Sequence, residues 1–297
     1  MHKLFYCDHH SFNLPDGHKF PTRKYRLTRD LLAPDGCFEF ERAPLADSET
    51  VMLAHDPEYV SRFIAGTLDA NVMRRIGFPW SRGLVDRTLA SVGGTLAAAQ
   101  IAIEKGWCGN LAGGTHHAFY AEGAGFCVWN DMAITIHALR KHHGLTRFAV
   151  IDLDVHQGDG TAQMFATDPD VLTLSFHGKN NFPFRKQTSK IDVAFEDHTG
   201  DTEYLRRLTE TLPLVFDFRP QAVFYQSGVD ALASDRLGRM SLTAPGLAER
   251  DRLVLTACRN FGAPTIITMG GGYSDPIELS AAVHAETYRT AARLWAS

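Results

Sequence analysis

The chain has 297 residues, of which 44% are apolar and 22% charged, a composition typical of a globular protein that can bury a large core. Its formal net charge of −4, without a basic block, argues against direct nucleic-acid binding, which needs clustered Lys and Arg. The 5 cysteines form no C-x-x-C pair, the amino terminus has no signal-peptide pattern and no apolar run could span a bilayer, so we expect a cytoplasmic protein without a membrane anchor.

The first part of the chain is expected to contain few regular elements. Residues 8–42 are rich in charge, Pro and Gly, and we expect loops there with one short helix over residues 23–32. Apolar residues at helical spacing from Leu84 to Ile103 predict a long helix. A second helix is predicted over residues 130–143, with Asn130 or Asp131 as its N-cap.

The remainder of the chain alternates between strand and helix patterns. Buried strands are predicted at Phe148–Ile151, Val171–Ser175, Ala222–Tyr225 and Thr265–Thr268, and helices at Thr202–Phe216, Gly246–Asn260 and Pro276–Trp295. Such alternation indicates an α/β fold with a parallel sheet covered on both faces. Because ligands bind beyond the carboxyl ends of such strands, site residues should follow the strands directly. We find no repeat or linker and expect one domain over residues 1–297.

The strongest chemical signal is the segment from Asp152 to Gly160, which directly follows a predicted strand. If the chain stays extended there, Asp152, Asp154 and His156 share one face, and Asp154 and His156 can reach one metal ion. Zinc accepts this mixture of carboxylate oxygen and imidazole nitrogen. Asp230, a few residues beyond another predicted strand, supplies a third ligand. Three protein ligands with an open position are typical of a catalytic zinc site.

Two further motifs provide candidate catalytic groups. His116 and His117 follow a Gly pair, and histidine titrates near neutral pH, as proton transfer requires. Asp152 and Asp159 are available to orient these rings. Three glycines before Tyr273 would let the backbone approach a ligand and direct the Tyr273 hydroxyl at an oxyanion. The Gly125-Phe126-Cys127 segment and the pair Phe182 and Phe184 could supply aromatic walls.

Together, these motifs and their order resemble the zinc-dependent histone deacetylases, a family that includes bacterial deacetylase-like amidohydrolases. Gln157 and the stretch from Ser234 to Leu242 are most similar to the class IV branch. The resemblance implies an arginase/deacetylase-type fold, in three layers, with a mostly parallel sheet of about eight strands between helices. It implies hydrolysis of acylated amines, above all N6-acyl-lysine in proteins or peptides, by one deacetylase-like catalytic domain.

The resemblance also implies a role for each motif residue. Zinc would be held by Asp154, His156 and Asp230, and the catalytic groups would be His116, His117, Tyr273, Asp152 and Asp159. Substrate would be bound by Gly125, Phe126, Phe182 and Gly271. A structural cation, usually potassium, would lie on Asp152, the backbone oxygens of Asp154, His156 and Phe176, and the Ser175 hydroxyl.

The chain departs from the better-known eukaryotic enzymes at the rim of the site and at its ends. Residues 71–82 contain no acidic residue to match the rim Asp that holds a peptide backbone there, and we expect the protein to lack the tails that place those enzymes in complexes. Both departures weigh against a histone substrate. Small acylated amines such as acetylpolyamines therefore remain an alternative. The sequence also leaves open the acyl group, the oligomeric state and the physiological metal, since a mixed nitrogen and oxygen site can bind iron or cobalt as well as zinc.

Two other functions are less compatible with these motifs. An arginase-type amidinohydrolase with two manganese ions needs an Asp-x-Asp at the third ligand, but Asp230 is followed by Ala231 and Leu232. A non-catalytic binding module would be expected to have lost one of the ligands, the His pair or the Tyr, and all are present.

Overall fold

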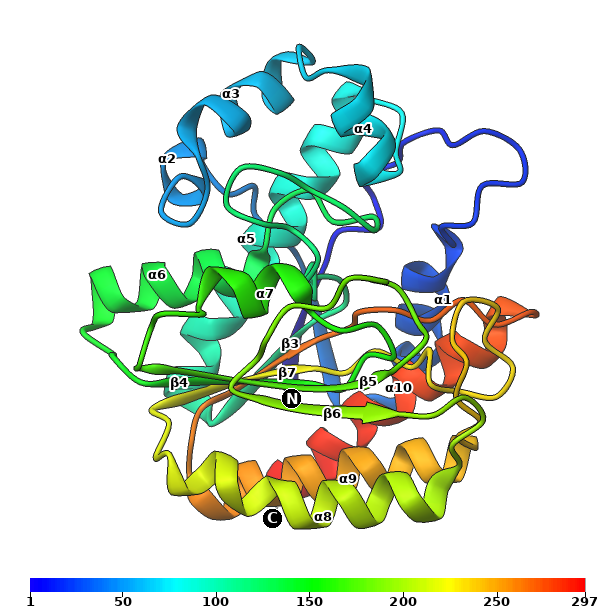
Figure 1. The fold of residues 1–297 in the computed structure, drawn as a ribbon. Helices are drawn as coiled ribbons and strands as arrows, with labels where there is room; N and C mark the ends of the chain where they lie inside the picture. The colour runs from blue at the N-terminus through cyan, green and yellow to red at the C-terminus, as the bar shows by residue number, and fades with distance from the viewer. Residues whose placement is uncertain (297) are drawn as a thin grey trace.

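The computed structural model describes residues 1–296 and shows eight strands in one parallel sheet between two layers of helices (Figure 1). The strands are β1 (His2–Tyr6), β2 (Phe38–Arg42), β3 (Trp107–Asn110), β4 (Phe148–Asp152), β5 (Val171–Gly178), β6 (Ile191–Phe195), β7 (Ala222–Gln226) and β8 (Thr265–Thr268). Their order in the sheet is β2-β1-β3-β8-β7-β4-β5-β6, and every pairing is parallel. The predicted fold class is therefore confirmed.

Ten α-helices accompany the strands among these residues. They are α1 (Arg23–Leu32), α2 (Ser48–Val51), α3 (Pro57–Ala65), α4 (Ala70–Ile76), α5 (Arg82–Lys105), α6 (Asp131–His143), α7 (Asp159–Met164), α8 (Asp201–Asp217), α9 (Ala244–Phe261) and α10 (Ile277–Trp295), with a short 3₁₀ helix at Ala33–Asp35. Helices α8, α9 and α10 cover one face of the sheet, and α5 and α6 cover the other (Figure 1). Helices α2, α3 and α4 lie beyond α5 and α6, at the top of the view.

Local sequence accounts for where the long helices begin. The Ser81 side chain accepts a hydrogen bond from the backbone N–H of Leu84 at the start of α5, and Asn130 accepts one from Ala133 at the start of α6. Thr243 caps α9 in the same way, with a proline in the first turn. Of the two residues predicted for the α6 cap, Asn130 is the one that caps it.

The central strands are buried on both faces, as expected for a parallel sheet between helices. Every residue of β4, β5, β7 and β8 is buried, and these are the four strands that the sequence predicts. The expectation of loops throughout residues 8–42 outside α1 is wrong at β2, an edge strand with a largely exposed sequence, FEFER. The strands β1, β3 and β6 were likewise not predicted.

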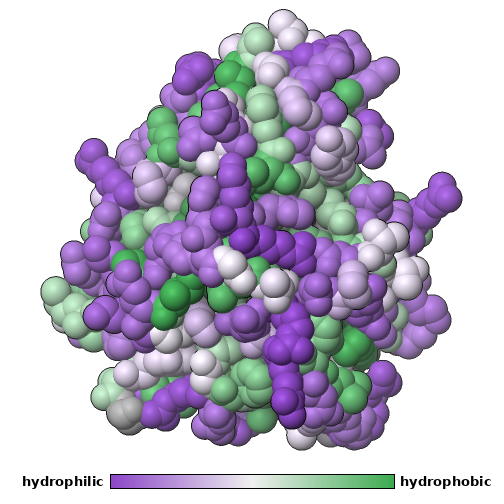
Figure 2. Space-filling model, turned by 90° about the vertical axis from the view of Figure 1, so that its left-hand side faces the viewer, coloured by the Kyte–Doolittle hydropathy of each residue, from purple (hydrophilic) through white to green (hydrophobic). Residues whose placement is uncertain are grey.

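The surface opposite the carboxyl ends of the strands is mixed in character. Figure 2 shows apolar residues there in small separate groups among polar ones. No helix within residues 1–296 is long and apolar enough to cross a lipid bilayer.

Candidate metal and catalytic site

Four strands that neighbour one another in the sheet deliver the predicted site residues. Strands β3, β8, β7 and β4 end at Asn110, Thr268, Gln226 and Asp152, and the loops that follow carry the His pair, the Gly-rich segment, Asp230 and Asp154. Segments far apart in the sequence therefore meet at the carboxyl ends of these central strands.

Asp154, His156 and Asp230 form a buried cluster. Their ligand atoms all lie within 4.8 Å of one another. His156 Nδ1 lies 3.0 Å from Asp154 Oδ1 and 3.0 Å from Asp230 Oδ2. Burial and the neighbouring Asp154 charge raise the pKa of Asp230 above its usual range, because two carboxylates share one buried site. A divalent cation would balance both charges, so this donor set fits zinc.

The extended conformation considered for residues 151–156 is not found in the structure. Strand β4 ends at Asp152, and the chain does not stay extended to His156. A loop brings the ligands together instead. The backbone N–H of His156 donates to Asp154 Oδ1 at 3.0 Å, and that of Val155 donates to Asp230 Oδ1 at 2.8 Å. Backbone hydrogen bonds to these two carboxylates bend the loop. An alternating pattern of apolar and polar residues gives no information about such hydrogen bonds.

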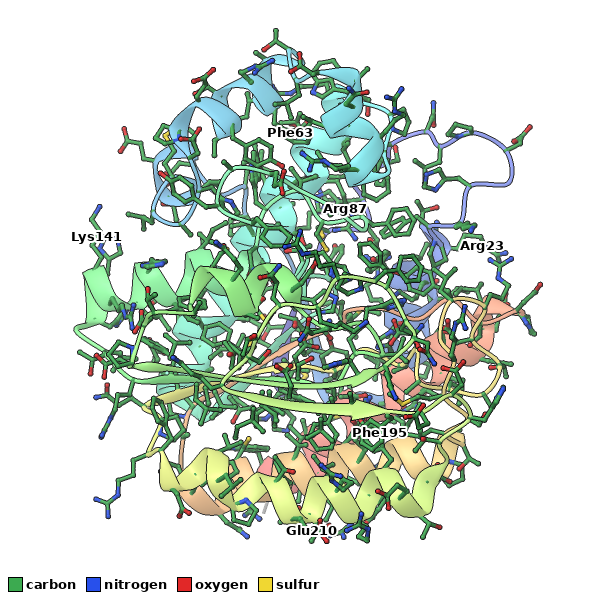
Figure 3. The ribbon with its side chains drawn as sticks, in the orientation of Figure 1. Arg23, Phe63, Arg87, Lys141, Phe195 and Glu210 are labelled. Carbon is green, nitrogen blue, oxygen red and sulfur yellow. The ribbon has the colours of Figure 1, made fainter. Side chains whose placement is uncertain are left out.

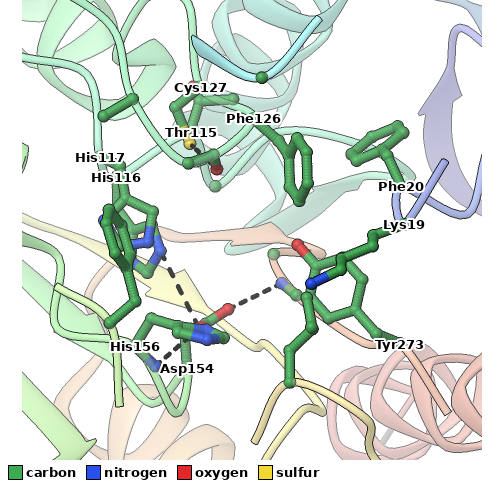
Figure 4. A pocket seen from close by; sticks show the side chains of 18 of the residues that line it. Lys19, Phe20, Thr115, His116, His117, Phe126, Cys127, Asp154, His156 and Tyr273 are labelled. Carbon is green, nitrogen blue, oxygen red and sulfur yellow. Dashed lines mark hydrogen bonds and ion pairs between the residues drawn. The ribbon is translucent and has the colours of Figure 1, made fainter. Parts of the chain in front are cut away.

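Each histidine of the tandem pair has its own carboxylate. His116 Nδ1 lies 2.7 Å from Asp152 Oδ2, and His117 Nδ1 lies 2.6 Å from Asp159 Oδ1. All four side chains are buried, and the two rings lie 4.1 Å apart between centroids. Because Nδ1 of each ring is engaged, Nε2 is the nitrogen left for the pocket (Figure 4).

The electrostatics of the two rings differ. Burial disfavours the charged form of His116, but Asp152 and Asp154 outweigh this effect and raise its pKa to about 9. Burial and the charge on His116 lower the pKa of His117 to about 4, against the effect of Asp159. The pair can therefore hold one proton at neutral pH, on His116, while His117 is a neutral base.

The Gly-rich loop after β8 closes over the acidic cluster. The backbone N–H of Gly271 donates to Asp154 Oδ2 at 2.7 Å, and a Cβ on Gly271 would lie 2.0 Å from Asp230 Oδ2. Only glycine permits this approach. Tyr273 lines the pocket across from the histidines (Figure 4). Burial, together with Asp154 and Asp230, raises the pKa of Tyr273 well above its usual value, so its hydroxyl remains a donor.

Aromatic side chains line the approach to this cluster. The pocket encloses about 780 Å³, and Phe126 and Phe182 both line it. The Phe182 ring lies 4.9 Å from that of His117, and the Phe126 ring lies 6.3 Å from that of Tyr273. Gly125 has a φ of +53°, and a Cβ there would lie 2.7 Å from the His117 ring. Phe184 also lines the pocket but is 85% exposed, so it belongs to the mouth.

The residues predicted to hold a structural cation lie on β4, β5 and the loop after β4. The register of the two strands puts Asp152 opposite Ser175. The Ser175 hydroxyl lies 3.0 Å from His177 Nδ1, and Asp152 is engaged with His116. This geometry does not identify an ion, so the potassium site on Asp152, Asp154, His156, Ser175 and Phe176 stays a prediction.

Several polar residues that support the site were not found from the sequence. Gln226 donates to Asp154 Oδ2 at 3.2 Å, and Asp131 accepts from the backbone of Gly114 and Thr115. Lys24 donates to the Gly270 carbonyl at 2.8 Å, and Asp235 accepts from the backbone N–H of Tyr273 at 2.6 Å. Asp131, the charged first residue of a largely apolar helical pattern, was an available signal, whereas Lys24 lies among other charged residues and gave none.

Comparisons with known proteins agree with this geometry. Residues 18–289 match the model of the histone deacetylase domain. The chain is 43% identical to an uncharacterized protein of Picosynechococcus over 94% of both chains. It is 34% identical to a probable deacetylase of Archaeoglobus fulgidus (86% of this chain, 76% of the relative) and 30% identical to histone deacetylase 2 of Arabidopsis thaliana (86% and 70%). A crystal structure of a histone deacetylase homologue complexed with SAHA matches with a TM-score of 0.83 at 25% identity, covering 97% of this chain and 84% of the other.

Proposed function

Because the chain belongs to the histone deacetylase family, we propose that it is a zinc-dependent amidohydrolase that removes acyl groups from N6-acyl-lysine in proteins or peptides. Family membership implies a hydrolase of the deacetylase type. Zinc, the lysine substrate and the residue roles below are our proposal. The observation that carries it is the pairing of two histidines with separate carboxylates beside a buried Asp-His-Asp cluster and opposite Tyr273.

The protein side chains divide the work of amide hydrolysis. Zinc on Asp154, His156 and Asp230 would supply Lewis-acid activation of the substrate carbonyl and of a water molecule. His117, neutral and oriented by Asp159, takes the proton from the attacking water at Nε2 and passes it to the leaving amine. His116, held charged by Asp152, stabilises the negative charge that develops.

Tyr273 and the aromatic walls complete the proposed mechanism. The Tyr273 hydroxyl donates a hydrogen bond to the oxyanion of the tetrahedral intermediate. Phe126 and Phe182, with the close backbone approaches at Gly125 and Gly271, bind the aliphatic stem of the substrate and exclude water. The charge at the mouth supports a peptide over an acetylpolyamine, because Lys19 and Arg236 line the pocket and would repel a polycation. Arg75 and Arg239 also line it, but they are paired with Glu122 and Asp197.

The test is hydrolysis of a panel of acyl-lysine peptides by zinc-loaded and metal-stripped protein. We expect only the loaded protein to cleave. His117→Ala should lower kcat/KM by roughly 10²–10⁴-fold with zinc content unchanged, because a general base is lost and no ligand is touched. His142→Ala, which removes an exposed histidine from α6, is the matched control. Cleavage of acetylpolyamines alone, or of no substrate by loaded protein, would contradict the proposal.

We further propose that the protein belongs to the class IV branch, that it is bacterial and cytoplasmic, that residues 1–297 form one catalytic domain, and that potassium is its structural ion. Direct nucleic-acid binding is still not expected, on charge alone.

A further inference from the structure

Helix α5 forms one side of the pocket, next to the loop that carries the catalytic histidines, and we call this part of the pocket the inner branch. Leu84, Arg87, Thr88 and Ser91 all line the pocket, and their spacing puts them on one face of α5. The backbone N–H of Gly113, three residues before His116, donates to Ser91 Oγ at 3.2 Å. The α5 face is therefore continuous with the loop that carries the histidines.

The residue that immediately precedes His116, Thr115, is small and lines the pocket. Its hydroxyl contacts the Trp129 carbonyl and Asp131 Oδ1, both at 2.5 Å, which fixes the side chain. A substrate whose carbonyl lies at the metal cluster could thus extend its acyl end toward α5.

Arg87 is the charged group of the inner branch, and it is not neutralised by a carboxylate. It is 8% exposed, and its guanidinium contacts the Cys7 thiol and lies 4.5 Å from the centre of the Tyr25 ring. Figure 3 shows it between α5 and the amino-terminal part of the chain. Within residues 1–296, no carboxylate oxygen lies within ion-pair distance of Arg87.

The neighbours of Arg87 do not cancel its charge. Burial raises the pKa of the Cys7 thiol, so the thiol is neutral at physiological pH. Asp8 contributes a negative field, but its ion pair is with Arg29 at 2.9 Å. Lys24, a second buried cation, lies 5.2 Å from the centre of the same Tyr25 ring. A buried cation without a counter-charge is costly, and a ligand carboxylate would offset that cost.

From this arrangement we infer that the enzyme accepts acyl groups that end in a carboxylate, such as succinyl or glutaryl, and that Arg87 binds that carboxylate. The inference rests on the proposed function and names its acyl class. Arg binds carboxylates in a bidentate manner, and such charge-assisted bonds are among the strongest polar contacts. Hydrolysis adds one water across the amide and yields a dicarboxylate and the free lysine amine, so no further reactant is needed.

The experiment compares lysine peptides acylated with malonyl, succinyl, glutaryl or adipoyl groups with peptides that carry uncharged acyl groups of the same length. For the wild-type protein we expect kcat/KM to favour at least one carboxylated acyl group by about tenfold or more over its uncharged counterpart. Arg87→Met should abolish or invert that ratio, and Arg87→Lys should retain part of it. Arg82→Met, which removes an exposed cation of the same helix, should leave the ratio unchanged.

A binding measurement separates this inference from the proposed function. Calorimetry on zinc-loaded protein should show tighter binding of one dicarboxylate than of the matching monocarboxylate, and Arg87→Met should remove the difference. Cleavage of acetyl or butyryl peptides without any carboxylate preference overturns the role of Arg87 and leaves the amidohydrolase intact. If no peptide is cleaved, the proposed function fails, and equal binding of the two acids then also overturns the role of Arg87. Thermal unfolding of each variant verifies that it is folded.

Discussion

The Tyr273 hydroxyl faces the pocket from the side opposite the histidines, and burial keeps it protonated. We expect Tyr273→Phe to lower kcat by roughly 10²–10³-fold, the effect of removing one oxyanion donor. Zinc content should not change, because Tyr273 is not a ligand. Steady-state kinetics and metal analysis test this, with Tyr120→Phe, an exposed tyrosine, as the control. Wild-type turnover in Tyr273→Phe would rule out the assigned role.

A second residue-scale prediction concerns pH and a histidine outside the catalytic pair. His55 is fully buried, its Nε2 accepts from the backbone N–H of Asn130 at 2.8 Å, and its Nδ1 donates to the Tyr120 carbonyl at 3.2 Å. Burial lowers the pKa of His55 to about 4. The pKa of His55 in the folded protein lies below its value of about 6.5 in the unfolded chain. As the pH falls below 6.5, the unfolded chain therefore binds the proton more readily, and the folded state is destabilised.

The sign of this effect follows from the two pKa values. Above pH 6.5, neutral His55 makes its full contribution to the free energy of unfolding. As the pH falls toward 4, that contribution decreases by about 3 kcal/mol. Urea unfolding of wild type and His55→Gln between pH 7 and pH 4 measures it, because glutamine does not titrate. The difference in unfolding free energy between the two proteins should shrink by about that amount, and a constant difference would show that His55 does not titrate as stated.

At the scale of elements, helix α9 connects the two loops that carry the metal-ligand cluster. Arg250 of α9 is fully buried and donates to the carbonyls of Gly228 at 2.6 Å, Ser227 at 3.3 Å and Leu153 at 3.4 Å. It also pairs with Asp251. One side chain thus fixes the positions of the loops after β4 and β7.

Removing that connection should destabilise the protein and loosen the site together. We expect Arg250→Met to lower the unfolding free energy by about 3–5 kcal/mol, as when one partner of a buried ion pair is removed. Arg252→Met is the matched control, because Arg252 pairs with Glu249 on the exposed side of the same helix and should cost under about 1 kcal/mol. Denaturant unfolding with zinc titration measures both effects, and equal costs for the two variants would contradict the role of Arg250.

The strands that could be predicted from the sequence are those that are buried on both faces and rich in Val, Ile and Phe. Strand β8 has the predicted bounds, and β4 and β7 extend one residue further. Strand β3 (WCGN) is equally buried, but Gly and Asn are not typical strand residues, so its sequence does not predict a strand. Gly109 leaves room for the Tyr288 ring, and the Asn110 side chain donates to the Ser91 carbonyl. Such residues can be assigned to a strand only when their neighbours are known.

The site residues also fall into two groups, those that could be predicted from the sequence and those that could not. Residues in short motifs, such as His116 with His117 and Asp154 with His156, could be found together because the chain itself brings them close. Gln226 and Arg250 act on loops from other strands, and sequence order does not give sheet order. The bent loop at Asp154 was missed for a related reason, since backbone hydrogen bonds to carboxylates leave no periodic pattern.

At the scale of the whole molecule, the buried cluster of two carboxylates couples metal binding to stability. Because zinc would bind the folded chain alone, free zinc at about 100 times its Kd should add about 2.7 kcal/mol, and chelation should remove it. Thermal unfolding with and without chelator measures the shift. Asp230→Asn should abolish it, whereas Asp217→Asn, at the exposed end of α8, should retain it. A shift that persists in Asp230→Asn would place the metal elsewhere.

The position of β8 has a consequence for how the chain is made. This last strand, Thr265–Thr268, lies between β3 and β7, and so joins β2-β1-β3 to β7-β4-β5-β6. Until it emerges from the ribosome, β3 and β7 lack their common partner, and strand edges left open in this way are liable to pair wrongly. Closing the gap requires contacts between residues far apart in the sequence, a slow step in folding. The four strand ends that form the site therefore come together only after β8 has been made, and we expect a chain interrupted before Thr265 to be inactive and prone to aggregate.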